Sequence, residues 1–330
     1  MNLFYSFAFM CFVGQISDQE TLKNNPQIQS FNSVKIIADL YQNNRPDTVQ
    51  TIDFSNQGLR KVPEILRKYK HIKEIDLSHN QIKKIPKWLT AGDSLHTLTF
   101  THNPVNVRKL KFTTNTTLKT LNLTKNKLKM LPKSLSKNRI LEVLVLAQND
   151  FVEIPSRITL CQNLKVISFY ENKVRTISPD LSLLKHLNEL DLYHNQLSEI
   201  SDVIFNLDSL RVLALSYNSI QNIPESVGKL KQLQQLYLRD NGLKALPISL
   251  KELPNLTEIY VEKNLFTTFP TVLLEMPKLV EIDLGTNKIT EIPEGILRLK
   301  KLKLFDVRSN ALKSKKYLDE LRKNGVKVYE

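Results

Sequence analysis

The sequence is poor in the residues on which many kinds of functional site depend. It has only two cysteines, Cys11 and Cys161, so no disulfide framework can hold the fold together. Glycine is also scarce, with eight residues in 330, and no glycine-rich phosphate-binding loop occurs. The hydrolase motif G-x-S-x-G and the zinc-peptidase motif H-E-x-x-H are missing as well. We therefore expect no enzymatic activity, no catalytic residue and no cofactor.

What the sequence does contain is internal repetition. An asparagine recurs every 23 residues, at Asn80, Asn103, Asn126, Asn149, Asn172, Asn195, Asn218, Asn241, Asn264, Asn287 and Asn310. An earlier copy starts at Val49 and has Gln57 in the asparagine slot, which makes twelve units over residues 49–324. A constant period of this length predicts a solenoid, in which each unit is one turn of a coil and contacts only its neighbours.

Each unit combines the spacing of a strand with that of a helix. Counted from its first apolar residue, the unit that begins at Leu210 has apolar residues at positions 1, 4, 6, 11, 14, 18 and 21. Positions 4 and 6 alternate with exposed ones, which is strand spacing, so stacked units predict one long parallel sheet. Position 15 is proline in eight units, which ends the extended segment. The spacing 14, 18, 21 then predicts a short helix or helical turn on the outer side.

The asparagine column has a backbone role in this interpretation. The turn after each strand leaves N–H and C=O groups away from water, and such groups must be paired. A carboxamide offers both donors and an acceptor, so one asparagine can join its own turn to the next. We therefore predict that the column is structural and is not a ligand site.

The unit resembles the leucine-rich repeat, L-x-x-L-x-L-x-x-N-x-L-x-x-L-P-x-x-L-x-x-L. The match covers about residues 49–324 and is shown by Leu210-Arg-Val-Leu213-Ala-Leu215-Ser-Tyr-Asn218. It is similar to the 23-residue form of bacterial repeat proteins and of Ras-group intracellular repeat proteins. The resemblance implies an α/β fold, a right-handed solenoid with a curved parallel sheet on its concave side and short helices or turns on its convex side. It also implies a concave side that binds another protein.

The ends of the chain depart from the repeat. The apolar run at residues 3–13 makes residues 1–15 resemble a secretory signal peptide, with an untrimmed or misassigned start as the alternative. We predict a linker at residues 16–30, a capping helix at 31–48 and a capping strand at 325–330. The signal-like segment favours a secreted or cell-surface protein, and a cytoplasmic location is the alternative.

One unit and one region are unusual. The unit that begins at Leu95 has Arg108 and Lys109 at positions 14 and 15, and we predict an extended return leg there, caused by repeat decay or marking a contact point. Residues 60–140 hold 19 Lys and Arg against four Asp and Glu, in a chain with a net charge of +14. The turn lysines of this basic patch are Lys83, Lys84, Lys127 and Lys129.

The basic patch allows two interpretations. It is either a solvated surface or a site for weak contact with an anionic surface, which includes binding to a polyanion or a cell envelope. No aromatic residues interleave with these lysines, so we expect no specific nucleic-acid recognition.

The outward-facing side of the predicted sheet suggests where a protein partner binds. Positions 3, 5, 7 and 8 become apolar and aromatic from the fifth unit onward, amid mixed charge that includes Glu189 and Asp191. High β-propensity of valine and tyrosine is the alternative explanation. The candidate partner-binding residues are Val143, Val145, Val166, Tyr170, Tyr193, His194, Val212, Tyr217, Tyr237, Arg239, Tyr260 and Glu262. We expect a monomer that binds a protein ligand, and an intracellular signalling scaffold of Ras-group type is the alternative.

Pairs of titratable residues on neighbouring strands do not predict a chemical site. His79 and His102 fall at position 8 of adjacent units, but no carboxylate or thiol completes a metal site. Asp283 and Asp306 are also adjacent, and we expect both to be solvated on an open face. Cys161 occupies an apolar position, which predicts a buried thiol.

Overall fold

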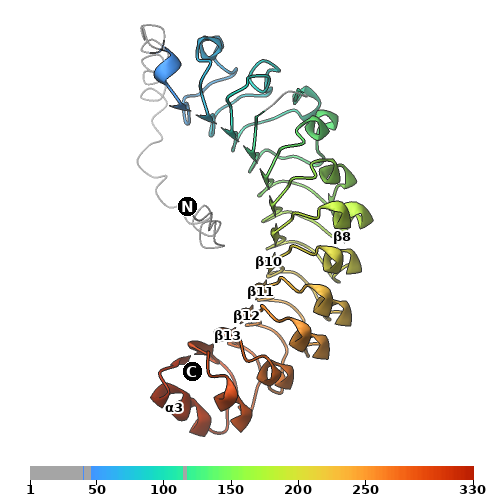
Figure 1. Ribbon diagram of the computed structural model, residues 1–330, viewed down its shortest axis with the longest axis vertical. Coiled ribbons are helices and arrows are strands. Elements are labelled where there is room, and N and C mark those ends of the chain that lie inside the picture. Colours follow the sequence, from blue (N-terminus) through green and yellow to red (C-terminus); the bar gives the residue numbers. More distant parts are fainter. Residues whose placement is uncertain (1–39, 41–45, 114–116) are drawn as a thin grey trace.

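The computed structural model describes residue 40, residues 46–113 and residues 117–330 (Figure 1). The predicted signal peptide at 1–15, the linker at 16–30 and Cys11 lie outside the described residues, as does nearly all of the predicted helix at 31–48. From Pro46 onward the chain winds into a curved solenoid, with strands on the inside of the arc and helical turns on the outside. The predicted fold class is confirmed.

The concave side is a single parallel sheet, with thirteen strands in the described part of the chain. In spatial order these are β1 (Thr51–Asp53), β2 (Glu74–Asp76), β3 (Thr97–Thr99), β4 (Thr120–Asn122), β5 (Val143–Val145), β7 (Val166–Ser168), β9 (Glu189–Asp191), β10 (Val212–Ala214), β11 (Gln235–Tyr237), β12 (Glu258–Tyr260), β13 (Glu281–Asp283), β14 (Leu304–Asp306) and β15 (Lys327–Tyr329). Paired residues are 23 positions apart, as Val212 and Gln235 are. The sequence period therefore sets the register of the sheet.

The outer legs of the coils carry short 3₁₀ helices. In the described residues these are η2 (Pro46–Thr48), η3 (Glu64–Lys68), η4 (Val107–Lys109), η5 (Lys133–Lys137), η6 (Ser156–Leu160), η7 (Pro179–Leu183), η8 (Asp202–Asn206), η9 (Glu225–Lys229), η10 (Ile248–Glu252), η11 (Thr271–Glu275) and η12 (Glu294–Arg298). Most follow a proline, as η9 follows Pro224, because proline fixes φ and cannot extend a strand. Segments this short favour i→i+3 bonding over an α-helix.

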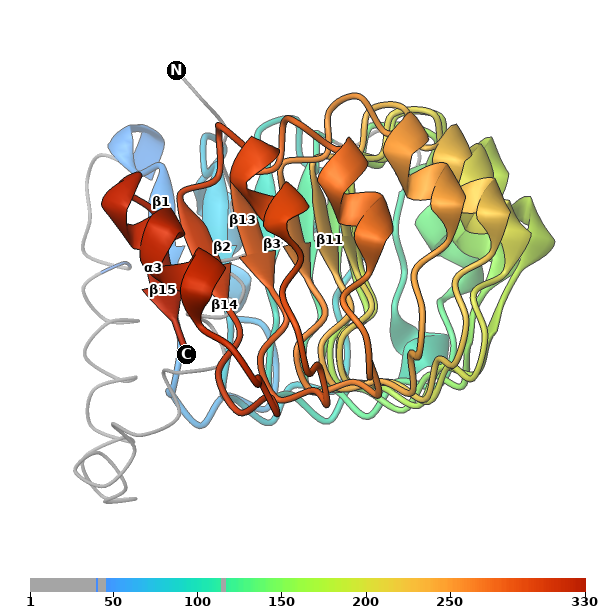
Figure 2. The same ribbon diagram turned by 90° about the horizontal axis from the view of Figure 1, so that it is seen from below.

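The outer side and the C-terminal end hold three further elements. β6 (Glu153–Ile154) and β8 (Thr176–Ile177) pair as a small second sheet. The α-helix α3 (Lys316–Lys323) packs beside β15 at the end of the sheet (Figure 2). None of the helices in the described residues is both long and apolar enough to cross a membrane.

The core runs without interruption along the solenoid between the sheet and the outer legs. Strand positions 4 and 6 supply leucine, isoleucine and phenylalanine, and Phe100 and Phe169 are completely buried. Cys161 is also completely buried, as predicted, and burial raises the pKa of its thiol to about 11. Each coil thus buries its apolar face only by stacking on its neighbours.

The asparagine column joins successive coils through backbone hydrogen bonds. Asn149 Nδ2 donates to the carbonyls of Leu123 in the preceding coil, at 2.9 Å, and of Leu146 and Ala147 in its own coil. Its Oδ1 accepts from the N–H groups of Asn126 and Leu128, at 3.0 and 2.9 Å. One buried side chain thus serves five backbone groups in two coils.

Each coil turns sharply just before its asparagine. The residue at position 8 has φ between 50° and 57° in all twelve units. His194 and Tyr217 are two examples. This left-handed conformation is disfavoured for residues other than glycine. Because the asparagine that follows bonds the carbonyls of the same turn, the conformation is maintained, and it places position 8 at the border of the concave face.

The unit that begins at Leu95 differs from its neighbours, although not wholly as predicted. Its return leg contains the three-residue helix η4, so the prediction of a fully extended leg is wrong for residues 107–109. The helix forms because the Asn106 side chain accepts a hydrogen bond from the N–H of Arg108. Leu110 and Phe112, which follow in extended backbone, are buried in the core.

Candidate functional site

All twelve candidate partner-binding residues lie on the concave side, and none of them is fully buried. The valines are supplied by β5, β7 and β10, and Tyr237 and Tyr260 by β11 and β12. Tyr170, Tyr193, His194, Tyr217, Arg239 and Glu262 occupy positions 7 and 8, just beyond the ends of their strands. The 23-residue register therefore gathers side chains from six coils onto one surface.

Five tyrosines form two stacked groups, which we call the aromatic band: Tyr170, Tyr193, Tyr217, Tyr237 and Tyr260. The ring centroids of Tyr170 and Tyr193 are 5.1 Å apart, and those of Tyr193 and Tyr217 are 4.8 Å apart. Tyr237 and Tyr260 stack almost parallel at 4.8 Å. Such spacings are those of favourable aromatic pairs, so the rings hold one another in place before any partner arrives.

Charged side chains surround the aromatic band and are themselves held in place. The guanidinium of Arg239 lies 5.4 Å from the ring centroid of Tyr217 and forms an ion pair with Glu262. The ammonium of Lys263 lies 5.6 Å from the same ring and pairs with Asp240. Ion pairs and cation–π contacts thus fix the polar rim of the tyrosines.

The hydroxyl of Tyr260 connects two carboxylates. It donates to Glu281 at 2.6 Å and lies 3.2 Å from Glu258. Burial, the hydrogen bond to Glu281 and the charges of both carboxylates raise the pKa of Tyr260 well above its usual value. The hydroxyl therefore stays protonated, and this end of the face carries concentrated negative charge.

Two acids that were expected on the exposed rim are buried, so that prediction is wrong. Asp191 is completely buried, and Glu189 is 6% exposed. Asp191 accepts hydrogen bonds from Ser168 Oγ at 2.7 Å and from the N–H of Tyr193 at 3.0 Å. Its side chain lies between the small Ser168 and Ala214 on the neighbouring strands.

Burial changes the acidity of this pair. It raises the pKa of Glu189 to about 7, with a further contribution from the charge of Asp191. It raises the pKa of Asp191 to about 6, although the hydrogen bonds from Ser168 and Tyr193 oppose the shift. Each unit of pKa shift corresponds to about 1.4 kcal/mol of difference between the protonation states. The ionised pair therefore destabilises the native state.

Replacing Asp191 with asparagine is expected to stabilise the protein at pH 8 by roughly 2 kcal/mol, and to have a much smaller effect at pH 4. Between about pH 4 and pH 7 the native carboxyls retain protons that the unfolded chain has lost, so wild-type stability falls as pH rises through that window. Urea denaturation at both pH values measures the difference. A substitution that destabilises equally at both would contradict this account.

A second carboxylate pair was also predicted to be solvated, and this prediction is wrong. Asp283 and Asp306 are 8% and 4% exposed. Burial, together with contact to Glu262, raises the pKa of Asp283. Asp306 is paired with Arg308, whose Nε lies 2.9 Å from Oδ2. These acids would be exposed to solvent on an isolated strand. On the curved face, neighbouring side chains cover them.

The two histidines at position 8 contact each other directly. The rings of His79 and His102 stack at 3.9 Å, and burial and the neighbouring His79 lower the pKa of His102 to about 4. In the described part of the chain, His, Cys, Asp and Glu side chains form no group of three that could hold a metal ion.

The lysines of the basic patch, Lys83, Lys84, Lys127 and Lys129, are all exposed. The expectation that no aromatic residue lies among the cations of this region is wrong. Trp88 lies beside Lys87 and Lys84, with the guanidinium of Arg67 over its ring at 4.8 Å. The sequence did contain a signal for this arrangement. Trp88 is the only tryptophan of the chain, and it lies on the outer leg of a basic coil.

Models of repeat families match the chain in four places. A model described as "Leucine-rich repeat region" matches residues 198–323, and one described as "Leucine Rich repeat" matches 114–129. A third, "Leucine Rich Repeat", matches residues 71–91 and 186–207. The chain belongs to the leucine-rich-repeat proteins. Proteins of this family are commonly protein–protein interaction modules and are generally not enzymes. No curated protein matches the sequence.

Solved leucine-rich-repeat structures share the fold. The ectodomain of the plant membrane receptor kinase GASSHO1/SCHENGEN3 from Arabidopsis thaliana is 27% identical, with a TM-score of 0.61 over 86% of this chain and 41% of that chain. An internalin (inlF) from Listeria monocytogenes is 15% identical, with a TM-score of 0.62 over 90% of this chain and 94% of that chain. The leucine-rich-repeat chain thus spans less than half of the plant ectodomain.

Proposed function

We propose that this leucine-rich-repeat protein is a non-enzymatic module that binds a protein partner on its concave face. The observation that carries the proposal is the aromatic band, in which five partly exposed tyrosines lie in contact across neighbouring coils. Tyrosine and arginine are enriched among the residues that dominate binding energy at protein interfaces. Because the rings already stack on one another, they lose little conformational freedom when a partner covers them.

The charge of the concave face defines the chemistry of the partner. Apart from the four buried acids, positions 3, 5, 7 and 8 of the twelve described units carry eight acidic side chains against four Lys and Arg, although the whole chain has a net charge of +14. The acidic residues that are at least partly exposed are Asp53, Glu74, Asp76, Glu171, Asp240, Glu258, Glu262 and Glu281. Complementary potentials guide specific association, so the partner presents a basic surface with apolar or aromatic contacts.

The size of the face fits a protein rather than a small molecule. Neighbouring strands lie ~4.8 Å apart, so the six strands from β5 to β12 in the concave sheet span about 25 Å. An interface of standard size buries about 800 Å² on each partner, which a patch of this width supplies. The solved ectodomain that is 27% identical is in complex with Casparian strip integrity factor 2, which supports a binding role for the similar solenoid.

The signal-like run at residues 3–13 favours action at the cell surface or outside the cell. Affinity capture from the host tests the proposed function. We expect a protein that the wild-type chain retains and that a variant with an altered aromatic band loses. A capture profile that the altered band does not change would contradict the proposal.

A further inference from the structure

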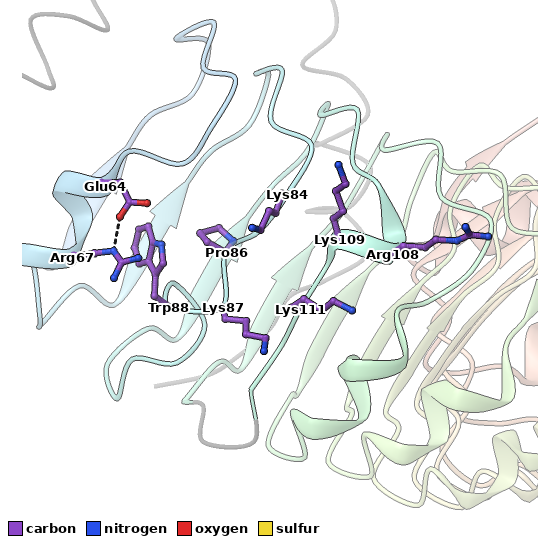
Figure 3. A pocket seen from close by; sticks show the side chains of 9 residues that line it. All are labelled: Glu64, Arg67, Lys84, Pro86, Lys87, Trp88, Arg108, Lys109 and Lys111. Atoms are coloured by element: carbon purple, nitrogen blue, oxygen red, sulfur yellow. Dashed lines mark hydrogen bonds and ion pairs between the residues drawn. The ribbon is translucent and has the colours of Figure 1, made fainter.

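A strongly basic groove lies on the outer legs of the first three coils, away from the concave face (Figure 3). Its volume is about 690 Å³. The lining residues are Glu64, Arg67, Lys84, Pro86, Lys87, Trp88, Arg108, Lys109 and Lys111. Six of these nine side chains are cationic, and the single acid, Glu64, forms an ion pair with Arg67. The groove is therefore an unusually concentrated positive surface.

The groove exists because the usual outer helix is missing from the described residues of two successive coils. Along most of the solenoid, five-residue 3₁₀ helices pack against one another from coil to coil, as η9 and η10 do. Within the described residues, no such helix occurs between η3 and η5, and only the three-residue η4 lies there. Figure 3 shows Trp88 and Pro86 in the space that this leaves. The irregular unit that begins at Leu95 thus builds one wall of a groove.

The cations of the groove are not neutralised by the protein. Lys84, Lys87, Arg108, Lys109 and Lys111 form no ion pair with any described residue. Like charges at this density repel one another, and no described contact compensates for the repulsion. In Figure 3 the side chains of Arg108, Lys109 and Lys87 point in different directions rather than toward one point. This arrangement suits a ligand that carries several separated negative charges.

We propose that the groove binds a linear acidic polysaccharide. Sulfate or carboxylate groups along such a chain would pair with the cations of successive outer legs, and the partly exposed ring of Trp88 would offer an apolar surface to a sugar ring. Single-stranded nucleic acid is disfavoured because its sites stack successive bases on several aromatic side chains, whereas the groove has one. A lipid bilayer is disfavoured because the cations line a hollow and not a flat surface.

Binding of a heparin dodecasaccharide, measured by titration calorimetry on the full chain at two salt concentrations, tests this inference. We expect salt-sensitive binding that weakens by about 30-fold when Lys84, Lys87, Arg108 and Lys109 are all replaced with alanine, at about 2–3-fold per cation. A matched control replaces Lys244, Lys278, Lys300 and Lys301, which removes the same charge from exposed sites outside both the groove and the basic patch. The control variant is expected to bind within about 3-fold of wild type.

Trp88 provides an independent check, because its removal changes no charge. Trp88→Ala is expected to weaken heparin binding by about 5-fold, and Trp88→Phe to retain most of the affinity. Circular dichroism shows whether each variant is folded, which matters because Trp88 also packs against the core.

Several results would overturn the inference. They are undetectable heparin binding, equal losses in the groove variant and the control, or tighter binding of a 15-nucleotide poly(U) or of phosphatidylserine-containing vesicles. The variant with Tyr193→Ala and Tyr217→Ala should bind heparin like wild type, so this proposal and the proposed function can fail separately.

Discussion

Replacing both Tyr193 and Tyr217 with alanine is expected to weaken partner binding by at least ~100-fold, since truncating a central aromatic residue of an interface typically costs about 2 kcal/mol or more. The two rings contact each other at 4.8 Å, and Tyr217 also lies beneath Arg239 and Lys263. The double substitution therefore removes apolar contact area and also the support that holds two charged side chains in place. Because both rings are partly exposed, the fold should be retained.

Titration calorimetry with the captured partner measures this loss. The matched control replaces Leu160 and Leu183 with alanine, because these residues are 52% and 55% exposed on the outer helices η6 and η7. The control should stay within about 3-fold of wild type, as expected for residues outside the interface. If the tyrosine variant binds as tightly as this control, the aromatic band is not the binding site.

The largest loss of stability is expected for Asn149→Leu, which should lower the free energy of unfolding by about 3 kcal/mol. The substitution leaves the N–H groups of Asn126 and Leu128 without this acceptor, and it removes one donor from each of three carbonyls. Water cannot easily replace the carboxamide, because Asn149 is only 6% exposed. Since each coil is stabilised mainly by its neighbours, the defect should weaken the solenoid on both sides.

Urea denaturation followed by circular dichroism measures this effect. Asn163→Leu is the matched control, because Asn163 is exposed and donates a single hydrogen bond, to the carbonyl of Arg139. Its expected cost is below about 0.5 kcal/mol. If Asn149→Leu unfolds at the same urea midpoint as the control, the asparagine column does not have the proposed structural role.

The sequence was sufficient to predict the fold because every unit repeats the same spacing. The structure inferred for one unit therefore applies to all of them. A 23-residue spacing places Val212 opposite Gln235 and Tyr237 opposite Tyr260, so the tyrosines could be assigned to one surface from their positions alone. The alternation within each strand then separated core from concave side chains. The boundaries predicted for the segments before residue 49 remain predictions, because they lie almost wholly outside the described residues.

The burial of acids on the concave face could not be predicted in the same way. The repeat period and the strand alternation predict that Glu189, Asp191 and Asp283 point away from the core. They do not predict how much of each side chain the neighbouring side chains cover. Asp191 lies between Ser168 and Ala214 and accepts a hydrogen bond from Ser168, so its environment is a property of three coils together. The groove at Trp88 likewise depends on two adjacent coils whose described residues form no five-residue helix.

The most direct test of the central claim, that the concave face receives a protein partner, is site-specific photo-crosslinking. A photoreactive phenylalanine analogue at position 217 is compared with the same group at position 160 on the outer leg. The concave-face account predicts a covalent adduct with the partner from position 217 and none from position 160. An adduct formed only from position 160, or equally from both positions, would contradict it.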